Sequence, residues 1–454
     1  MAIQSINPTN GKLIKSFNEI NLSEVHKIIE NTNQAFLKWR EVPIAARCKL
    51  LKSAADVLLK NKNQYAEAMT LEMGKPITQA IAEVEKCALV CNYYSKNAEK
   101  ILANEVIKTD ASESYVCFDP LGIILAVMPW NFPFWQVFRF AAPALAAGNV
   151  GLLKHASNVP MCALAIEDVF RQAGFPEYVF KTLLIGSSLV DEVVNHPFVK
   201  AATLTGSEPA GRSVASACGK LLKKTVMELG GSDPFIILAD ANLDEAVKVA
   251  VKARLLNNGQ SCIAAKRFIV IQEVFNQFEK MFVTEMEKTK IGDPMNIATE
   301  LGPIARKDLR IELHEQVKAS ISAGAKLLLG GKMIEGDGYF YPPTILSGVK
   351  KGMPAYEQEI FGPVATVIKA RDEEDALRIA NDTDFGLGAS LWTSDIEKAK
   401  QLASRIEAGA VFINGMVKSD PRLPFGGIKT SGYGRELSHY GIKEFVNIKT
   451  VWVK

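Results

Sequence analysis

The sequence predicts an α/β protein in which two doubly wound domains share one cleft. The chain has 454 residues, 48% of them hydrophobic and 23% charged, which is enough for two domains with their own cores. Short apolar runs alternate with helical patterns along most of its length, as in parallel sheets covered by helices on both faces. Ligands of such sheets bind beyond the carboxyl ends of the strands, so the residues that follow each strand are the first candidates for a functional site.

The N-terminal part is expected to be helical. Apolar residues recur at helical spacing over residues 24–39, and similar patterns cover 47–60 and 78–102. Pro43 and Gly74 separate these segments, because both residue types interrupt regular helices.

Buried parallel strands are predicted wherever a short apolar run is bounded by polar or turn residues. The first group lies at residues 122–128, 150–153, 179–185, 201–204 and 235–238. Helices are expected between them at 134–145, 160–173 and 209–218. A second group lies at 268–271, 326–329, 364–368, 388–393 and 411–413.

The composition argues against several classes of protein. The formal net charge is only +3 and no basic stripe is visible, so nucleic acid is not an expected partner. The start of the chain lacks the pattern of a secretory signal. The most apolar stretch, residues 122–153, contains three prolines and an arginine, so no membrane helix is expected. Seven scattered cysteines favour free thiols in a cytoplasmic protein over a disulfide framework, and no metal site is predicted.

The segment Asn257-Asn258-Gly259-Gln260-Ser261-Cys262 holds the first candidate for chemistry. Small and polar residues lead into a single cysteine after a helical segment, and a thiolate is a strong nucleophile toward a carbonyl carbon. A buried structural thiol is an equally good interpretation of this segment alone.

The segment Glu228-Leu229-Gly230-Gly231 holds the second candidate. The glycines allow the backbone to approach a ligand closely, and Glu228 could activate water as a general base. Taken by itself, this segment is better explained as a loop with a solvated carboxylate.

The segment Pro129-Trp130-Asn131-Phe132-Pro133 lies where a strand ends and a helix begins. The Asn131 amide could donate to a developing oxyanion, or it could simply cap the helix. Trp135 and Arg139 follow Asn131 at intervals of four residues, so all three are predicted on one helix face.

Two further strand ends could bind a nucleotide. Thr205-Gly206-Ser207 runs from a strand into a helix N-terminus, which favours a phosphate group. Lys154 follows another strand and could reach ribose hydroxyls or a phosphate. Both signals are weak, since such turns are common and a lysine at a strand end is usually a surface residue.

Together these segments resemble the aldehyde dehydrogenase superfamily over nearly the whole chain. The Pro-Trp-Asn-Phe-Pro, Thr-Gly-Ser, Glu-Leu-Gly-Gly, Gly-Gln-Ser-Cys, Glu-Ile-Phe-Gly-Pro and Pro-Phe-Gly-Gly segments occur in the order and rough spacing of that family. Within it, residues 414–427 are similar to the bacterial succinate-semialdehyde dehydrogenases.

The resemblance implies roles for the candidate catalytic residues. Cys262 would attack the aldehyde, and Asn131 with the Cys262 backbone N–H would stabilise the oxyanion. Transfer of a hydride to the nicotinamide would leave a thioester, and Glu228 would activate the water that hydrolyses it. Cofactor contacts would come from Trp130, Lys154, Ser157, Gly206, Ser207, Leu229, Glu359 and Phe361.

The coenzyme is expected to depend on Ser157. Strict NAD enzymes of the family often carry a glutamate there, and like charges ~4 Å apart repel by about 4 kcal/mol at an effective dielectric near 20. Serine removes this repulsion from a 2′-phosphate, and Lys154 lies close in sequence. NADP is therefore the expected coenzyme, with NAD possible.

The resemblance favours succinate semialdehyde as substrate, with Arg139 and Ser419 binding its distal carboxylate. Phe132, Trp135, Ser261 and Phe425 would complete the substrate pocket. Glutarate semialdehyde and neutral aliphatic aldehydes remain alternatives within the same chemistry. A CoA-acylating enzyme is disfavoured by Glu228, and a non-catalytic structural protein or a cysteine–histidine hydrolase is weaker still.

The resemblance also implies the organisation of the chain. Residues 1–111 and 122–228 would form the dinucleotide-binding domain, and residues 229–437 the catalytic domain. Residues 112–121 and 438–454 would form a β arm that pairs between subunits, so a homodimer or tetramer is expected.

Overall fold

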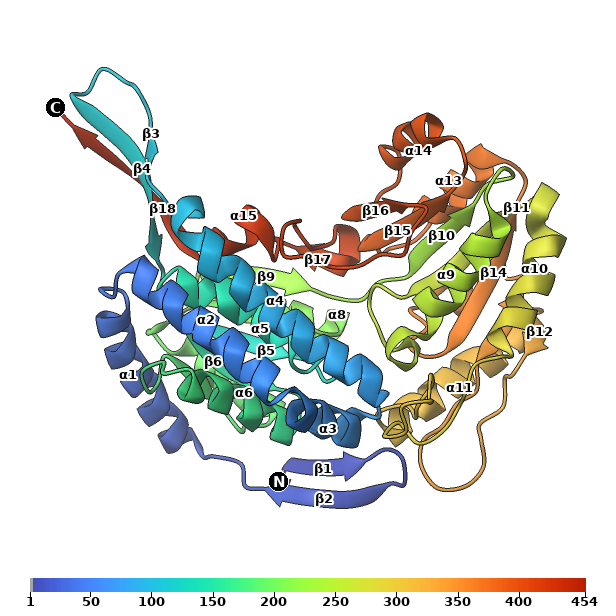
Figure 1. The fold of residues 1–454 in the computed structure, drawn as a ribbon, viewed down its shortest axis with the longest axis horizontal. Coiled ribbons are helices and arrows are strands. Elements are labelled where there is room, and N and C mark those ends of the chain that lie inside the picture. Colours follow the sequence, from blue (N-terminus) through green and yellow to red (C-terminus); the bar gives the residue numbers. More distant parts are fainter. Residues whose placement is uncertain (1–2) are drawn as a thin grey trace.

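A computed structural model describes residues 3–454 and shows two α/β lobes side by side (Figure 1). The first lobe is built on a six-stranded sheet in the order β17-β9-β8-β5-β6-β7. Five of its strands are parallel, and the short β17 pairs antiparallel with β9. The strands are β5 (Ile123–Met128), β6 (Val150–His155), β7 (Phe180–Thr182), β8 (Val199–Thr205), β9 (Lys224–Glu228) and β17 (Gly432–Tyr433).

Helices cover both faces of this sheet, and their burial follows the apolar spacing of the sequence. The first is α1 (Leu22–Trp39), which begins at a capping box formed by Asn21 and Glu24. The others are α2 (Ile44–Lys60), α3 (Lys62–Met73), α4 (Ile77–Ile101), α5 (Trp135–Ala146), α6 (Pro160–Gln172), α7 (Val190–Asn195) and α8 (Glu208–Lys220). Helix α5 is buried over its whole length, because it lies between the sheet and α4.

The second lobe contains a seven-stranded sheet in the order β12-β13-β14-β11-β10-β15-β16. Its strands are β10 (Asp233–Ile237), β11 (Ala265–Ile271), β12 (Lys326–Leu329), β13 (Thr344–Ser347), β14 (Val364–Ala370), β15 (Gly388–Trp392) and β16 (Ala410–Ile413). All neighbours are parallel except the edge strand β12. Its helices are α9 (Leu243–Leu255), α10 (Gln272–Met286), α11 (Lys307–Ser322), α12 (Pro354–Glu357), α13 (Glu373–Asn381) and α14 (Ile396–Ala403).

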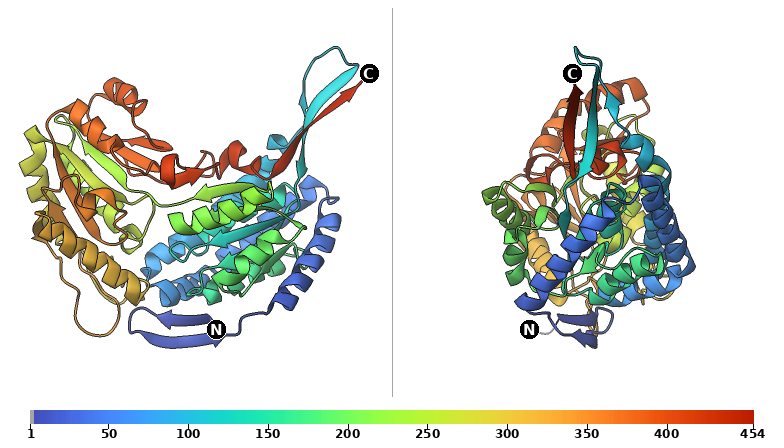
Figure 2. Two further views of the ribbon diagram at one scale, coloured as in Figure 1. Left: turned by 180° about the vertical axis from the view of Figure 1, so that it is seen from behind. Right: turned by 90° about the vertical axis from the view of Figure 1, so that its left-hand side faces the viewer.

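The remaining elements join or flank the lobes. A β-hairpin of β1 (Ile3–Asn7) and β2 (Lys12–Phe17) lies below the first lobe. A three-stranded arm of β3 (Glu105–Val106), β4 (Glu113–Pro120) and β18 (Val446–Val453) projects from the molecule (Figure 2). Short turns of helix lie at Ser187–Leu189, Leu256–Gly259, Lys429–Ser431 and Ser438–Ile442, the last of which is α15. No helix within residues 3–454 is long and apolar enough to cross a membrane.

The structure confirms the two-sheet architecture and corrects three details. Residues 3–17 form a hairpin, whereas the N-terminal part was expected to contain helices and no strand was predicted there. The strand expected at 235–238 belongs to the second sheet rather than the first. The first sheet instead contains β9, which begins with the polar pair Lys224 and Thr225 and therefore shows only a short apolar run.

Candidate active site

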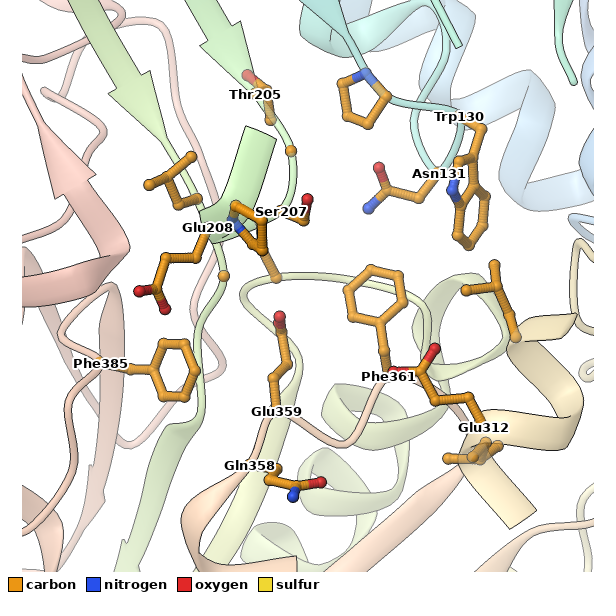
Figure 3. A pocket seen from close by; sticks show the side chains of 18 of the residues that line it. Trp130, Asn131, Thr205, Ser207, Glu208, Glu312, Gln358, Glu359, Phe361 and Phe385 are labelled. Carbon is orange, nitrogen blue, oxygen red and sulfur yellow. The ribbon is translucent and has the colours of Figure 1, made fainter. Parts of the chain in front are cut away.

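The cleft between the lobes has a volume of about 650 Å³, within the range of small-molecule sites. Its walls come from segments that follow strands of the first sheet and from loops of the second lobe (Figure 3). They include Trp130 and Asn131 after β5, Gly206 and Ser207 after β8, Leu229 and Gly230 after β9, and Cys262, Glu359 and Phe361 from the second lobe.

The loop that carries Cys262 has an unusual backbone. Three consecutive residues, Asn257, Asn258 and Gly259, have φ values of 57°, 57° and 73°. Asparagine tolerates this left-handed region better than most residues, and glycine adopts it freely. A Cβ at Gly259 would lie 2.3 Å from the Gly362 carbonyl carbon. The Gly-Gln-Ser-Cys and Glu-Ile-Phe-Gly-Pro segments therefore pack backbone against backbone.

Buried hydrogen bonds hold this loop in place. The Asn258 amide donates to the carbonyls of Gly74 and Pro303 at 2.8 and 2.9 Å. The Lys266 ammonium is buried and donates to the carbonyls of Ser261 and Cys262 at 2.9 and 2.8 Å. These buried hydrogen bonds restrict the loop, so the fold itself sets the position of Cys262.

Cys262 is partly exposed at the cleft. Desolvation raises the pKa of its thiol to about 12, although Arg139 and Lys266 favour the thiolate. The protein alone therefore holds the group as a thiol at neutral pH, and its proton must leave during the reaction.

Asn131 lies against the nucleophile loop, with its amide orientation fixed. Its Nδ2 donates to the Gln260 carbonyl at 3.0 Å, and its Oδ1 accepts from Gln136 Nε2 at 3.1 Å. It does not cap α5, whose first turn makes its hydrogen bonds to Glu83 instead. The helix-cap interpretation is therefore wrong, and one side of Nδ2 remains free to donate beside Cys262.

Glu228 ends β9 and is buried rather than solvated. Burial raises the pKa of its carboxyl group well above the ordinary value, and Glu436 adds to this effect. Arg139 and Arg435 oppose it. A Cβ at Gly426 would lie 2.7 Å from Glu228 Oε1, so the Pro-Phe-Gly-Gly segment makes room for this carboxyl group. Neither oxygen has a hydrogen-bond partner within residues 3–454.

The cofactor side of the cleft fits a dinucleotide. Gly206 and Ser207 lead into α8, and the Ser207 side chain makes no capping bond, so the first-turn N–H groups remain available to a phosphate. Glu359 Oε1 accepts from the Gly231 N–H at 3.0 Å and lies 3.4 Å from Lys266 Nζ. Phe361 and Trp130 meet edge to face with ring centroids 5.9 Å apart.

The residues expected to bind the adenosine part of the cofactor, Lys154 and Ser157, do not line the cleft. Lys154 is half-buried at the end of β6, and burial lowers the pKa of its ammonium group. Ser157 is exposed in the turn that follows. His155 between them accepts from the Ala156 N–H through Nδ1 and binds the Pro133 carbonyl through Nε2, both at 2.9 Å. It therefore connects this turn to the segment that carries Asn131.

The expected substrate residues have contrasting surroundings. Arg139 is buried, forms an ion pair with Glu436 and lies 4.4 Å from the Phe425 ring centroid. Phe132 packs under Lys75, with the ammonium 4.0 Å from the ring centroid. Ser261 is fully buried, with no partner for its hydroxyl within the described part of the chain.

The comparisons with known proteins identify the family. The aldehyde dehydrogenase family model matches residues 1–451. The chain belongs to the aldehyde dehydrogenase family. As such it is an enzyme that oxidises an aldehyde with a nicotinamide coenzyme.

Several relatives resemble this aldehyde dehydrogenase over its full length. A probable succinate-semialdehyde dehydrogenase [NADP(+)] of Synechocystis sp. is 55% identical over 453 residues, which cover 100% of both chains. The succinate-semialdehyde dehydrogenase [NADP(+)] of Mycobacterium avium is 51% identical, covering 100% of this chain and 97% of its own. The crystal structure of succinic semialdehyde dehydrogenase from Streptococcus pyogenes with NADP+ is 40% identical, with a TM-score of 0.98 and full coverage of both chains.

Sequence patterns did not reveal every residue that shapes this dehydrogenase site. Gln136 donates to Asn131, and Lys266 donates to the backbone of the Cys262 loop. Glu436 forms an ion pair with Arg139. Lys266 lies only four residues after Cys262, so its proximity could have suggested a role. Glu436 is nearly 300 residues from Arg139 in the chain, and no local pattern connects them.

Proposed function

We propose that this aldehyde dehydrogenase oxidises succinate semialdehyde to succinate and prefers NADP. The Synechocystis and Mycobacterium avium relatives carry this activity in their names, at 55% and 51% identity over the full chain. The observation that supports the chemistry most directly is the fixed Asn131 amide beside the Cys262 loop.

Cys262 is the proposed nucleophile. The thiol releases its proton to solvent in the cleft as the sulfur attacks the aldehyde carbon. The oxyanion of the resulting thiohemiacetal accepts hydrogen bonds from Asn131 Nδ2 and the Cys262 N–H. The nicotinamide cofactor, when bound, accepts the hydride. The remaining thioester is hydrolysed by water, and Glu228 takes the proton of that water. Burial raises the pKa of Glu228, so the share of its base form, which takes this proton, grows as the pH rises.

The cofactor is proposed to bind along the cleft. Gly206 and Ser207 hold the pyrophosphate at the start of α8, and Glu359 binds the nicotinamide ribose. Trp130, Leu229 and Phe361 line the rest of the cleft at the nicotinamide end of the cofactor. At the adenosine end, Ser157 leaves room for a 2′-phosphate without like-charge repulsion, and Lys154 supplies a positive charge.

The distal carboxylate of the substrate is proposed to bind near Arg139 and Ser419. Phe132, Trp135, Ser261 and Phe425 form the surrounding wall. A guanidinium and a hydroxyl are suitable donors for a carboxylate, and no such group would be needed for a neutral aldehyde.

The chain organisation is proposed to follow the domain boundaries expected from the sequence: 1–111 with 122–228, 229–437, and an arm of 112–121 with 438–454. The three-stranded sheet that the arm forms with β3 exposes Val106, Ile448 and Trp452 at 80%, 60% and 50%. Exposed apolar side chains on a three-stranded sheet with free edges favour pairing with another copy, so a homo-oligomer is proposed.

The test is initial-rate kinetics with succinate semialdehyde, using NADP and NAD in parallel and Cys262→Ala as the inactive reference. Higher kcat/KM with NADP, lost in the variant, is the expected result. Preference for NAD would contradict the coenzyme assignment. Cys262-dependent activity on glutarate semialdehyde or butanal but not on succinate semialdehyde would contradict the substrate assignment alone.

A further inference from the structure

The two proposed oxyanion donors belong to different lobes. Asn131 follows β5 of the first lobe, whereas the Cys262 N–H follows α9 of the second lobe. Both donors must lie about 2.7–3.1 Å from the oxyanion to stabilise it. The register between the lobes at this point is therefore as important as the conformation of either loop.

Asn257 joins the two walls of the proposed oxyanion hole. Its Nδ2 donates to the carbonyls of Asn131 and Gln260 at 2.7 and 2.9 Å. The same Gln260 carbonyl accepts from Asn131 Nδ2 at 3.0 Å. Asn257 is fully buried with a φ of 57°, and such a backbone persists only where its surroundings fix it. A group that holds Asn257 therefore helps to hold both walls.

Gln79 supplies this contact from the first turn of α4. Its Oε1 accepts from the Asn257 N–H at 2.7 Å, and its Nε2 donates to the Glu300 carbonyl at 3.4 Å. Helix α4 belongs to the first lobe, and its start lies beside the second lobe (Figure 1), where the Ile77 N–H donates to the Pro294 carbonyl at 2.8 Å. The hydrogen bond between Gln79 and Asn257 thus connects the two lobes.

The sequence at the start of α4 makes the Gln79 side chain available for this contact. Gln79 is the third residue of the helix, where a glutamine often accepts from the backbone N–H of the N-cap residue. The N-cap here is Pro76, which has no N–H and makes no side-chain cap. The Gln79 oxygen therefore has no partner at its own helix end and accepts from the other lobe instead.

The next turn of α4 holds the segment that carries Asn131. Glu83 lies four residues after Gln79 and so on the same helix face. Its buried carboxylate accepts from the N–H groups of Phe134 and Trp135 at 3.0 and 2.9 Å and forms an ion pair with Lys75. One helix face thus contacts the Asn131 segment through Glu83 and the Cys262 loop through Gln79, so α4 sets the spacing between them.

We propose that Gln79 is a positioning residue for the oxyanion hole, which acts through Asn257 to hold the Cys262 loop in register with Asn131. The proposal rests on the proposed function, because it takes Asn131 Nδ2 and the Cys262 N–H as the two donors. Gln79 does not line the cleft. It is therefore expected to affect the rate of attack on the aldehyde carbonyl and not the reactivity of the thiol itself.

The test compares four variants by rapid mixing with succinate semialdehyde and NADP. Gln79→Met removes the acceptor at similar length, and Gln79→Glu keeps it while losing only the donor to Glu300. Gln64→Met is the matched control, since Gln64 is exposed on the neighbouring helix α3. Asn131→Ala tests the oxyanion hole itself. The rate constant for the first formation of reduced coenzyme is measured because, unlike its amplitude, it does not depend on the fraction of folded protein.

Gln79→Met is expected to lower this rate constant about 10- to 100-fold, as a small misplacement of reacting groups does. Gln79→Glu should recover most of the loss, and Gln64→Met should match the wild type. Iodoacetamide provides a second readout, since it forms a sulfur–carbon bond with Cys262 as iodide leaves and the thiol proton goes to solvent, with no oxyanion. Its rate of reaction with Cys262, followed by mass spectrometry, should be the same in the Gln79 variants and the wild type.

The outcomes separate this role from the proposed function. A slow Asn131→Ala beside a Gln79→Met as fast as the wild type would overturn the role of Gln79 alone. The same conclusion would follow if Gln79→Glu were as slow as Gln79→Met, or if iodoacetamide reacted as slowly as the aldehyde. An Asn131→Ala as fast as the wild type, or a wild type that forms no reduced coenzyme, would contradict the proposed function and this role together.

Discussion

At the scale of single residues, the catalytic groups of this enzyme lie in a buried charge network. Arg139 favours the ionised forms of Glu228 and Glu436, whereas burial raises the pKa of both carboxyl groups. Cys262 is likewise held as a thiol. The fold therefore favours the neutral forms of the proposed nucleophile and the proposed base, so proton transfers are expected to accompany the chemical steps.

Glu228→Gln tests this account of the base. The variant should form the thioester and release one equivalent of reduced cofactor in a burst, after which turnover should slow about 10²- to 10⁴-fold for lack of general-base catalysis. Rapid-mixing absorbance of the reduced cofactor measures both phases.

The same assignment fixes the sign of a pH dependence. A raised pKa means that the base form of Glu228 increases as pH rises, so wild-type deacylation should accelerate toward alkaline pH. The groups that face it are Glu436, Arg139, Arg435 and Glu444. In Glu228→Gln this acceleration should disappear. A variant without a burst, or with the same pH profile as the wild type, would exclude Glu228 as the base.

The residues proposed to touch ligands could be found from the sequence because each lies in a short motif. Asn131 and Glu228 lie at strand ends, and Cys262 follows a helical segment. The groups that position them could not, because Gln136, Lys266 and Glu436 act through contacts that only the folded chain creates.

At the scale of elements, the sequence indicated strands wherever burial on both faces produced a continuous apolar run. Strands β5, β11 and β14 are of this type. The hairpin β1–β2 was not expected, because β2 is almost entirely exposed and contains lysines. The left-handed turn at Asn257–Gly259 also has no hydrophobic signature, although it determines where Cys262 lies.

Gly259→Ala tests the importance of that turn. The new Cβ would meet the Gly362 backbone at 2.3 Å, and φ is 73°, so the unfolding free energy should fall by about 1–3 kcal/mol, with loss of activity. Gly219→Ala is the control, because a Cβ there meets nothing within 4 Å. Gly219 lies in α8, where alanine is the better helix former, so Gly219→Ala should raise the unfolding free energy by up to about 1 kcal/mol. Thermal melting curves compare the two, and equal melting temperatures would show that the turn is not a constraint.

At the scale of the whole molecule, the arm is the part that a single chain leaves incomplete. Strands β4 and β18 pair along eight residues with each other, and β3 adds only two residues to one edge. The arm extends away from both lobes (Figures 1 and 2), so nothing in the described chain covers its apolar side chains. Their burial against a second copy would stabilise an assembly by about 1.5–3 kcal/mol per large side chain.

The double variant Ile448→Asp and Trp452→Asp should therefore dissociate the proposed oligomer. Both apolar side chains of β18 are at least half exposed. Each change replaces one of them with a charge that is costly to bury at an interface. Leu222→Asp is the control, since Leu222 is 95% exposed on the first lobe, away from the arm. Light scattering after size-exclusion chromatography should give a multiple of 49.6 kDa for the wild type and the control, and 49.6 kDa for the double variant. A monomeric wild type would refute the role of the arm, and an intact oligomer in the double variant would place the interface elsewhere on the molecule.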